Sequence, residues 1–242
     1  MRMMFLISTA IMSCVLHSSP VKSALGANGI NYEDIESEDY ISASEYIQNG
    51  LVAIYDGIEN VGYKSHSNHS LTWINLTGNG YNLPLSGQQW RKNCLDFLDI
   101  QRISTDGIIA VKTIEAVVEL YDYDTYIIGN SSMETGRRLW ITPGYIGYSY
   151  YYDDRQSAKL EWNINEKMHL AYTLVNFVNA NYYCNGILLP TTTGVLNSTY
   201  TANIGIGPFK GRIYCVRMYT RRLSGEEIAY NYEIDKERFN LK

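Results

Sequence analysis

Short apolar runs separated by turn residues follow one another along most of the chain after residue 50. Residues 51–55, 107–111 and 113–120 are rich in β-branched side chains, and 113–120 alternates apolar and polar positions. Runs of this length and composition predict β-strands. They recur about every 10–15 residues with few helical patterns between them, which is typical of a two-sheet antiparallel sandwich. We therefore expect an all-β fold.

Two local sequence patterns predict a hairpin and a helix. Asn185 and Gly186 separate two apolar runs, and both residue types tolerate the positive φ angles of a tight hairpin turn. Ser224 and Glu227 have the spacing of a capping box, in which each side chain satisfies a backbone amide of the first helical turn. Ile228 and Tyr232 follow on one face. We expect one short helix near the end of the chain.

The first residues resemble a secretion signal. Arg2 precedes an apolar run that ends near Leu16, and small residues follow, so we interpret 1–24 as a signal peptide. The run is shorter than the roughly 20 residues of a membrane span. Two alternatives are lipidation at Cys14 and an uncleaved buried or interfacial N-terminus. The predicted location is secreted or cell surface, with no integral membrane span.

An acidic stretch follows the signal-like segment. No basic residue lies between Lys22 and Lys64. We interpret residues 25–47 as a solvated acidic linker with a helical turn near 40–47. The remaining residues, 48–242, form the expected globular domain.

Charge and aromatic content narrow the function classes. The chain has 20 basic and 25 acidic residues, a formal charge of −5, which disfavours a nucleic-acid partner. Its 22 tyrosines outnumber the 5 phenylalanines and 4 tryptophans. Tyrosine has an apolar ring with a polar tip, so such a composition favours aromatic surfaces that also form hydrogen bonds.

Three cysteines remain if the first segment is removed: Cys94, Cys184 and Cys215. Their spacings match no zinc motif. We expect them to pack as small apolar side chains in strands. A disulfide between Cys184 and Cys215 is the alternative, and an odd number of thiols would still leave one unpaired.

Three stretches together resemble the concanavalin A-like lectin/glucanase superfamily, in its bacterial laminin-G-like branch. They are 50–60 with 73–80, 169–173 with 183–186, and 211–219 with 222–228. In that order they are similar to the opening strand and its glycine turn, to the central strand and its hairpin, and to the closing strand and its helix. The resemblance implies a jelly-roll sandwich with a recognition surface on the concave sheet or on loops at one rim. It does not imply one activity.

The residues do not favour an enzyme. Glycosidases of this superfamily carry a Glu-x-Asp-x-x-Glu strand motif, and the closest run here has Val117 where the Asp belongs. Glu115 and Glu119 would lie about 13 Å apart on one strand, which is too far for a retaining pair and beyond the usual inverting range. We expect both to be solvent-side charges. His169 is expected to be a structural imidazole, and His66 with His69 a solvated loop rather than a metal pair.

A cluster of rings supplies the predicted carbohydrate site. Sugars present apolar C–H faces rimmed by hydroxyls, which aromatic rings and planar polar groups can meet. Tyr148, Tyr150 and Tyr152 share one face by strand alternation. The alternative is that such rings fill the core. The predicted carbohydrate-binding residues are Tyr145, Tyr148, Tyr150, Tyr152, Trp162 and Arg155.

Calcium is the one cofactor that the resemblance brings in. The predicted ligands are Asp56, Asn60, Asn75 and Asn79. Their oxygens suit calcium, although Asn75 stands where an Asp is common in the family. The alternative is that these side chains form turns.

The sequence as a whole predicts a non-catalytic, secreted, lectin-like module that binds a carbohydrate or glycoconjugate or acts in adhesion. A structural or protein-interaction module at a cell or virion surface is the first alternative. A glycoside hydrolase with an unfamiliar pair of acids is the second.

Overall fold

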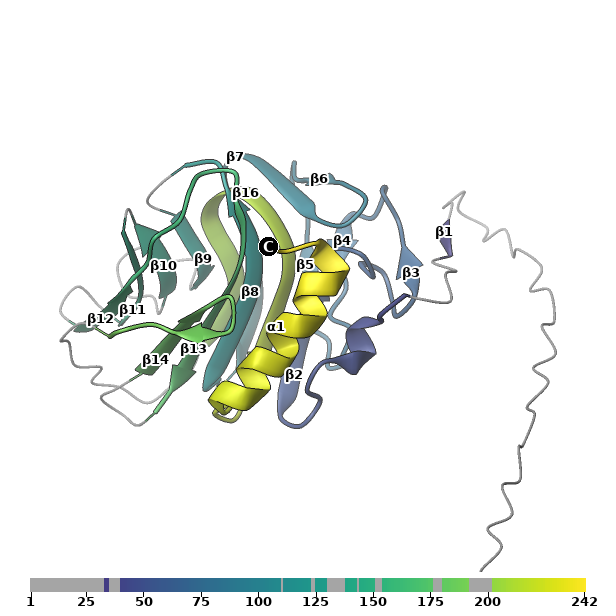
Figure 1. Cartoon of the computed structure of the whole chain (residues 1–242). Coiled ribbons are helices and arrows are strands. Elements are labelled where there is room, and N and C mark those ends of the chain that lie inside the picture. Colours follow the sequence, from purple (N-terminus) through teal and green to yellow (C-terminus); the bar gives the residue numbers. More distant parts are fainter. Residues whose placement is uncertain are drawn as a thin grey trace, which may run out of the picture. The chain divides into compact units, whose positions relative to one another are not determined.

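Antiparallel β-sheets make up most of the described chain, and one α-helix closes it (Figure 1). The computed structural model describes residues 33–34, 40–109, 111–122, 125–129, 138–142, 144–150, 154–175, 180–191 and 202–242. All of these belong to one unit, Tyr32–Lys242. Within it, every strand pairing is antiparallel, which confirms the all-β prediction.

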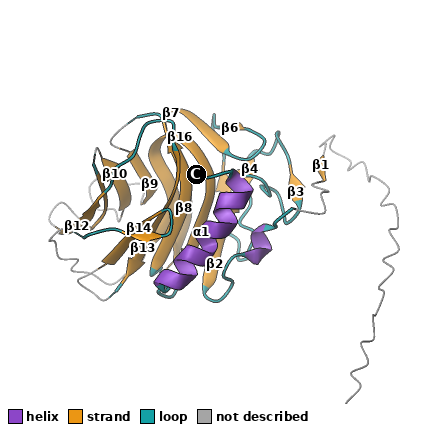
Figure 2. Ribbon diagram, viewed as in Figure 1, coloured by secondary structure: helices purple, strands orange, loops and turns teal. Residues whose placement is uncertain are grey.

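The larger sheet has eight strands in the order β15-β14-β13-β8-β16-β7-β6, with β2 pairing to β16 at the side (Figure 2). Their bounds are β2 (Leu51–Asp56), β6 (Gln89–Trp90), β7 (Leu95–Ile109), β8 (Thr113–Leu120), β13 (Lys167–Leu174), β14 (Ala180–Cys184), β15 (Ile187–Leu188) and β16 (Ala202–Tyr219).

A smaller sheet has four strands in the order β12-β11-β10-β9. Their bounds are β9 (Thr125–Gly129), β10 (Arg138–Thr142), β11 (Tyr145–Tyr150) and β12 (Asp154–Lys159). Two-residue strands form two further pairs, β1 (Glu33–Asp34) with β3 (Ser65–His66), and β4 (Thr72–Trp73) with β5 (Leu83–Pro84).

The main core lies between the two sheets. Alternate residues of β8, among them Ile114 and Val118, share one buried cluster with Leu139, Ile141 and Ile146 of the four-stranded sheet. Because successive side chains of a strand point to opposite faces, this packing uses only one face of β8.

The other face of the larger sheet is covered by α1 (Gly225–Phe239) and by the segment around the 3₁₀ turn Ala43–Glu45. Figure 1 shows α1 lying across this face, where Val117 of β8 shares a buried cluster with Ile234 and Phe239 of the helix. As a result all eight residues of β8 are buried. The expected solvent side of this strand does not exist, so the prediction that Glu115 and Glu119 are solvent-side charges is wrong.

The local signals behave as expected. Ser224 and Glu227 form both bonds of the capping box, so the predicted helix and its start are confirmed. Asn185 and Gly186 have φ angles of 48° and 74°, as a two-residue hairpin turn requires, and they join β14 to β15.

The expected linker ends earlier than the sequence indicates. Ala43 and Tyr46 are 0% and 1% exposed and pack against the helix-covered face, so residues 40–47 belong to the folded domain. Their apolar positions are too few to show a period, which hid this from pattern analysis. The predicted helical turn near 40–47 is present as Ala43–Glu45.

Cys94, Cys184 and Cys215 are free thiols, and all three pack against apolar clusters, as the first interpretation predicted. In the part of the chain that the structure describes, no helix is long and apolar enough to cross a membrane.

Candidate functional site

The outer face of the four-stranded sheet carries an exposed tyrosine, an exposed lysine and a half-buried tryptophan. Leu139 and Ile141 of β10 and Ile146 of β11 are fully buried on the core side. Alternation therefore puts Trp140 and Tyr145 on the opposite, outer face.

The indole of Trp140 occupies the space over Gly147 of the neighbouring strand, which is free because Gly147 has no side chain. The two residues are cross-strand partners. A Cβ atom at Gly147 would overlap ring atoms of the Trp140 indole, including Cε2 and Cζ2. The indole is half-buried. Strand β11 thus supports the indole, which restricts the positions that the ring can take.

Tyr145 extends this surface on the same face. Its side chain is 43% exposed, and its cross-strand partners are Thr142 and Lys159. Nζ of Lys159 lies 3.0 Å from Oε1 of Glu161, and both side chains are largely exposed, so solvent screens the pair. The hydrogen bond and charge of Glu161 hold the pKa of Lys159 above its usual value. We call Trp140, Tyr145, Gly147 and Lys159 the outer-face platform.

The outer-face platform combines two properties that suit a sugar. Flat rings stack on apolar C–H faces, and exposed polar groups at their edge can bond hydroxyls. The titratable groups of the platform, Tyr145 and Lys159, are both exposed to solvent.

The predicted carbohydrate residues do not share one face. Tyr148 and Tyr150 have the same strand parity as the buried Ile146, whereas Tyr145 has the opposite parity. The side chains of Tyr148, Tyr150 and Arg155 lie outside the described part of the structure, and so does Tyr152 entirely. Trp162 is half-buried and packs against the main core.

Trp140 is not among the carbohydrate-binding residues that the sequence predicted. Its role depends on being opposite Gly147, which is seven positions away across a turn. The sequence signal would have been a Trp and a Gly at matching positions of a predicted hairpin, since a glycine leaves room for a ring over the backbone.

Two of the predicted calcium ligands, Asn60 and Asn75, form hydrogen bonds to the backbone. The side chain of Asn60 bonds both N and O of Ser67, at 2.8 Å each. Oδ1 of Asn75 accepts the amide of Ile54 at 3.0 Å, and its Nδ2 donates to the carbonyl of Gly80 at 2.9 Å. These contacts satisfy the edge of β2 and the glycine turn.

Asp56 and Asn79 complete the predicted ligand set. Asp56 is paired to Arg238, with Nη1 to Oδ2 at 2.6 Å and Nη2 to Oδ1 at 3.0 Å, whereas Asn79 is exposed. Among the described residues, no group of three His, Cys, Asp or Glu is arranged to hold a metal ion. Calcium stays a prediction, and an ion at Asp56 would compete with Arg238.

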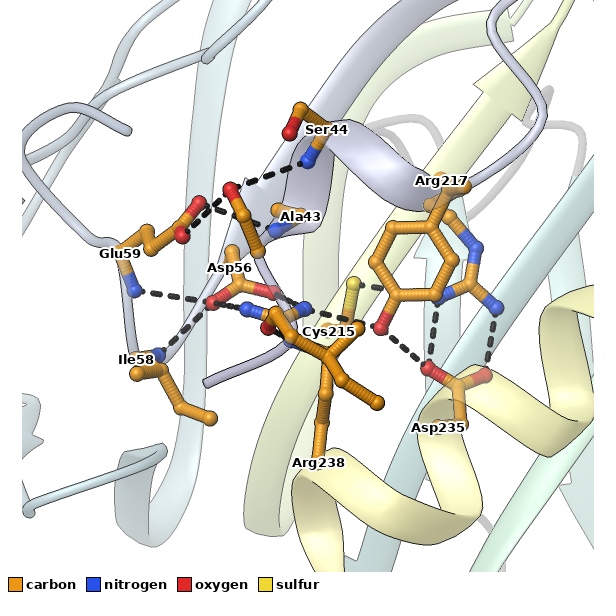
Figure 3. A network of polar contacts seen from close by, with 12 residues as sticks. Ala43, Ser44, Asp56, Ile58, Glu59, Cys215, Arg217, Asp235 and Arg238 are labelled. Atoms are coloured by element: carbon orange, nitrogen blue, oxygen red, sulfur yellow. Dashed lines mark hydrogen bonds and ion pairs between the residues drawn. The ribbon is translucent and has the colours of Figure 1, made fainter. Parts of the chain in front are cut away.

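A second polar cluster lies buried beneath α1, and Figure 3 shows two of its members, Arg217 and Asp235, facing each other. Oε2 of Glu115 accepts from Nε of Arg217 at 3.0 Å and from Nδ2 of Asn231 at 2.7 Å. The other two guanidinium nitrogens of Arg217 donate to Asp235 at 2.7 and 2.6 Å. All of these side chains are 0% exposed. We call Glu115, His169, Arg217, Asn231 and Asp235 the buried ion cluster.

The partners of Glu115 in the cluster lower its pKa. Burial alone would raise the pKa of Glu115, but the charge of Arg217 and the hydrogen bond of His169 outweigh it, so the pKa of that carboxyl lies below its usual value. Nε2 of His169 lies 3.2 Å from Oε1 of Glu115, which confirms the predicted structural imidazole.

Tyr46 and Arg238 connect this cluster to Asp56. The hydroxyl of Tyr46 donates to Asp235 at 2.6 Å and accepts from Arg238 at 2.9 Å, while its ring lies 4.0 Å from the guanidinium of Arg217. Burial raises the pKa of Tyr46 well above its usual value. These bonds connect the segment before β2 to α1 and so stabilise the fold.

Glu119 also has partners, although its cation is partly exposed. Its Oε1 lies 3.2 Å from Nη1 of Arg212, and its Oε2 accepts from the hydroxyl of Tyr214 at 2.7 Å. His66 is buried and bonds the carbonyl of Ile58 at 2.9 Å and Asn68 at 3.0 Å, so the expected solvated loop is wrong at this residue. His69 remains exposed.

No family model matches the chain, and no curated protein matches it. A solved structure of Trypanosoma rangeli sialidase in complex with sialic acid is similar, with a TM-score of 0.56 and 15% identity over 78% of this chain and 33% of the sialidase. The botulinum neurotoxin type G receptor binding domain is similar too, with a TM-score of 0.54 and 14% identity over 77% of this chain and 52% of that domain. At such identities the likeness shows a shared fold alone, and the chain spans only a third to a half of these proteins.

Proposed function

We propose that this protein is a non-catalytic carbohydrate-binding module of the concanavalin A-like type, with a jelly-roll sandwich, secreted or held at a cell surface. Its binding site is the outer-face platform. The observation that carries the proposal is the indole of Trp140 packed over Gly147, on the same face of the sheet as the exposed ring of Tyr145.

Energetics favour this arrangement. A ring that is already held in its binding orientation loses little conformational freedom when a ligand stacks on it. Aromatic contacts contribute about 0.5–1.5 kcal/mol beyond the area they bury. Two adjacent rings therefore suit the modest affinity of a single sugar site.

The comparisons support the proposal only in part. One similar structure holds sialic acid and another is a receptor binding domain, so proteins of this fold bind such partners. The non-catalytic role rests on the glutamates of β8, because Glu115 is paired to Arg217 and Glu119 to Arg212, away from the platform strands.

The test is a glycan array followed by titration calorimetry on the full chain and on Trp140→Ala and Tyr145→Ala. We expect each variant to lose about threefold to tenfold in affinity, from about 0.5–1.5 kcal/mol of lost ring contact. Tyr230→Ala is the matched control, since Tyr230 is 50% exposed but lies on α1.

Unchanged affinity in both platform variants, with melting temperatures that show intact folding, would refute the platform as the site. Hydrolysis of any bound glycan during the titration would refute the non-catalytic role.

Protein recognition is the second candidate, and a specific observation favours it. Leu98 and Ile100 of β7 are 48% and 69% exposed, on the side of the strand opposite the buried Phe97. Neighbouring exposed apolar residues are typical of an interaction surface. Ile100→Ser would then weaken capture of a surface partner while leaving glycan binding intact.

A further inference from the structure

We infer that two copies of this chain form a dimer by exchanging residues 40–47, which we call the N-terminal strap. In the dimer, the strap of one copy fills the groove that holds the strap of the other. The partner is thus a second copy of this chain, and the inference does not depend on the proposed function. It rests on the way in which the strap is held and on the short turn that joins the strap to β2.

The loop after β2 binds the strap as it would bind a separate peptide. None of residues 40–47 belongs to a β-strand. Instead, Oε1 of Glu59 accepts from the hydroxyls of Tyr40 at 2.8 Å and Ser42 at 2.9 Å. Its Oε2 accepts the amide of Ala43 at 3.2 Å, and Figure 3 shows Glu59 directed toward Ala43. These contacts depend on the residues of the strap, so the strap of another copy would make the same ones.

Helix α1 forms the other wall of the groove. Oδ1 of Asn231 accepts the amide of Ile47 at 3.0 Å, and Nε of Arg238 donates to the carbonyl of Ile41 at 2.8 Å. The two pairs are 184 and 197 residues apart in the sequence. Both contacts bind the backbone of the strap, and neither requires that strap and helix belong to the same copy.

The groove has to be filled by a strap from one copy or the other. Ala43, Tyr46 and Glu59 are all buried, at 0%, 1% and 0% exposure. Without a strap, the carboxylate of Glu59 would lose its three hydrogen bonds, and the apolar surface that covers Ala43 and Tyr46 would face water. Both changes cost free energy. A chain whose strap has opened therefore favours a second copy whose strap has opened too.

A tight turn joins the strap to β2. The amide of Leu51 donates to the carbonyl of Gln48 at 3.1 Å. Gly50 has a φ angle of 80°, as the third residue of a type II turn requires. Only residues 48–50 separate the strap from β2, and short hinges of this kind promote exchange. In the exchanged dimer this turn opens, while identical residues of the other copy remake the contacts of the strap with its groove.

The first experiment measures the dimer by sedimentation of the full chain over a range of concentrations. Gly50→Ala should strengthen the dimer about tenfold, because alanine is strained at this positive φ and opening the turn relieves that strain in both copies. In the closed turn, a Cβ at Gly50 would also lie 2.9 Å from Cγ of Arg221. Gly78→Ala is the matched control, since Gly78 has a φ of 74° but lies in a loop that the exchange leaves unchanged.

The second experiment identifies the exchanged element by mixing two variants of the full chain. Tyr46→Phe weakens the strap, because it removes the hydroxyl that bonds Asp235 and Arg238. Glu59→Gln weakens the groove. Neither variant alone has an intact strap in an intact groove. In the mixture, exchange places the intact strap of the Glu59→Gln chain in the intact groove of the Tyr46→Phe chain.

Hydrogen exchange read by mass spectrometry detects this pairing, since the two straps differ by one oxygen atom. Once the dimer fraction is constant, part of the strap of the Glu59→Gln chain should exchange about tenfold more slowly than before mixing. The matched control mixes Glu59→Gln with the double variant Tyr46→Phe/Glu59→Gln. No groove is intact in that mixture, so protection should not rise. Melting curves establish that each variant is folded before mixing.

Two outcomes overturn the inference. The first is a chain that stays monomeric at every concentration, both unmodified and as Gly50→Ala. The second is a dimer in which mixing leaves the strap of the Glu59→Gln chain as unprotected as before, because such a dimer uses another surface.

Discussion

The buried ion cluster and the outer-face platform lie on opposite sides of the molecule's β layers and use polar groups in opposite ways. In the cluster, Arg217 is fully buried and bonds both Glu115 and Asp235. On the platform, Tyr145 and Lys159 are open to solvent. The cluster has the more reactive residue types, yet its carboxylates are already occupied.

This difference shows that a cluster of reactive side chains is not by itself available to a ligand. Buried charges persist because partners within the fold replace their water, so removing a partner is costly. Exposed rings contribute little to folding and keep their surface for a ligand. The cluster should therefore govern stability and the platform should govern binding, and each of the following experiments tests one side of that division.

The largest expected effect is on stability, from Arg217→Ala. The substitution leaves Glu115 and Asp235 buried without their cation, which costs about 3–5 kcal/mol. For a domain of this size, that is about 6–20 °C in melting temperature. Thermal unfolding by circular dichroism measures it, with the exposed Arg222→Ala as control. A loss of unfolding free energy below about 1 kcal/mol would contradict a stabilising role of the cluster. Weaker glycan binding by the folded fraction would show that the cluster also affects binding.

Tyr46→Phe should have an intermediate effect. It removes one hydroxyl that bonds both Asp235 and Arg238, and hydrogen bonds to charged groups contribute about 1.5–3 kcal/mol. The ring stays, so its contact with Arg217 is kept. Urea unfolding of this variant beside Tyr230→Phe, an exposed tyrosine on α1, gives the difference. Equal stabilities would show that the bonds of Tyr46 are not needed.

Acid should weaken the cluster before it affects the platform. The pKa of Glu115 is lower in the folded state than its usual value of 4.5. The unfolded chain therefore binds more protons as pH falls through this range, and stability present above about pH 4.5 is lost below it, by up to about 1.4 kcal/mol per pH unit. Urea unfolding from pH 7 to pH 3 measures the slope.

Glu115→Gln should flatten that slope, whereas Glu237→Gln, at an exposed position of the helix, should leave it as it is. An identical slope in Glu115→Gln would show that this carboxyl does not contribute to acid unfolding.

The smallest expected effect is on affinity, from Gly147→Ala. The new Cβ would overlap the indole, so Trp140 must leave the strand surface. We expect about threefold to tenfold weaker glycan binding, with altered near-ultraviolet circular dichroism from the indole and little change in melting temperature. Gly225→Ala is the control, since its Cβ would meet only ordinary contacts with Tyr183. Unchanged affinity would mean that the orientation of Trp140 is irrelevant to binding.

Local signals in the sequence determined several elements of this protein. The cap at Ser224 and the turn at Asn185-Gly186 were predicted at the right residues, because each depends on backbone conformation within four positions. Alternation in 113–120 predicted a strand, and the structure has it with the same bounds. These features need no knowledge of what packs against them.

Tertiary structure decided which faces are buried and which residues meet. The alternation on β8 predicted one buried face and one solvent face, so Glu115 was expected on the solvent side. In the structure α1 covers that second face, and Glu115 is buried. Its partner Arg217 lies 102 residues away, and no local pattern can place them together. The platform likewise exists only through the register that lays Trp140 over Gly147, because a shift of one residue would send every side chain of β10 to the other face.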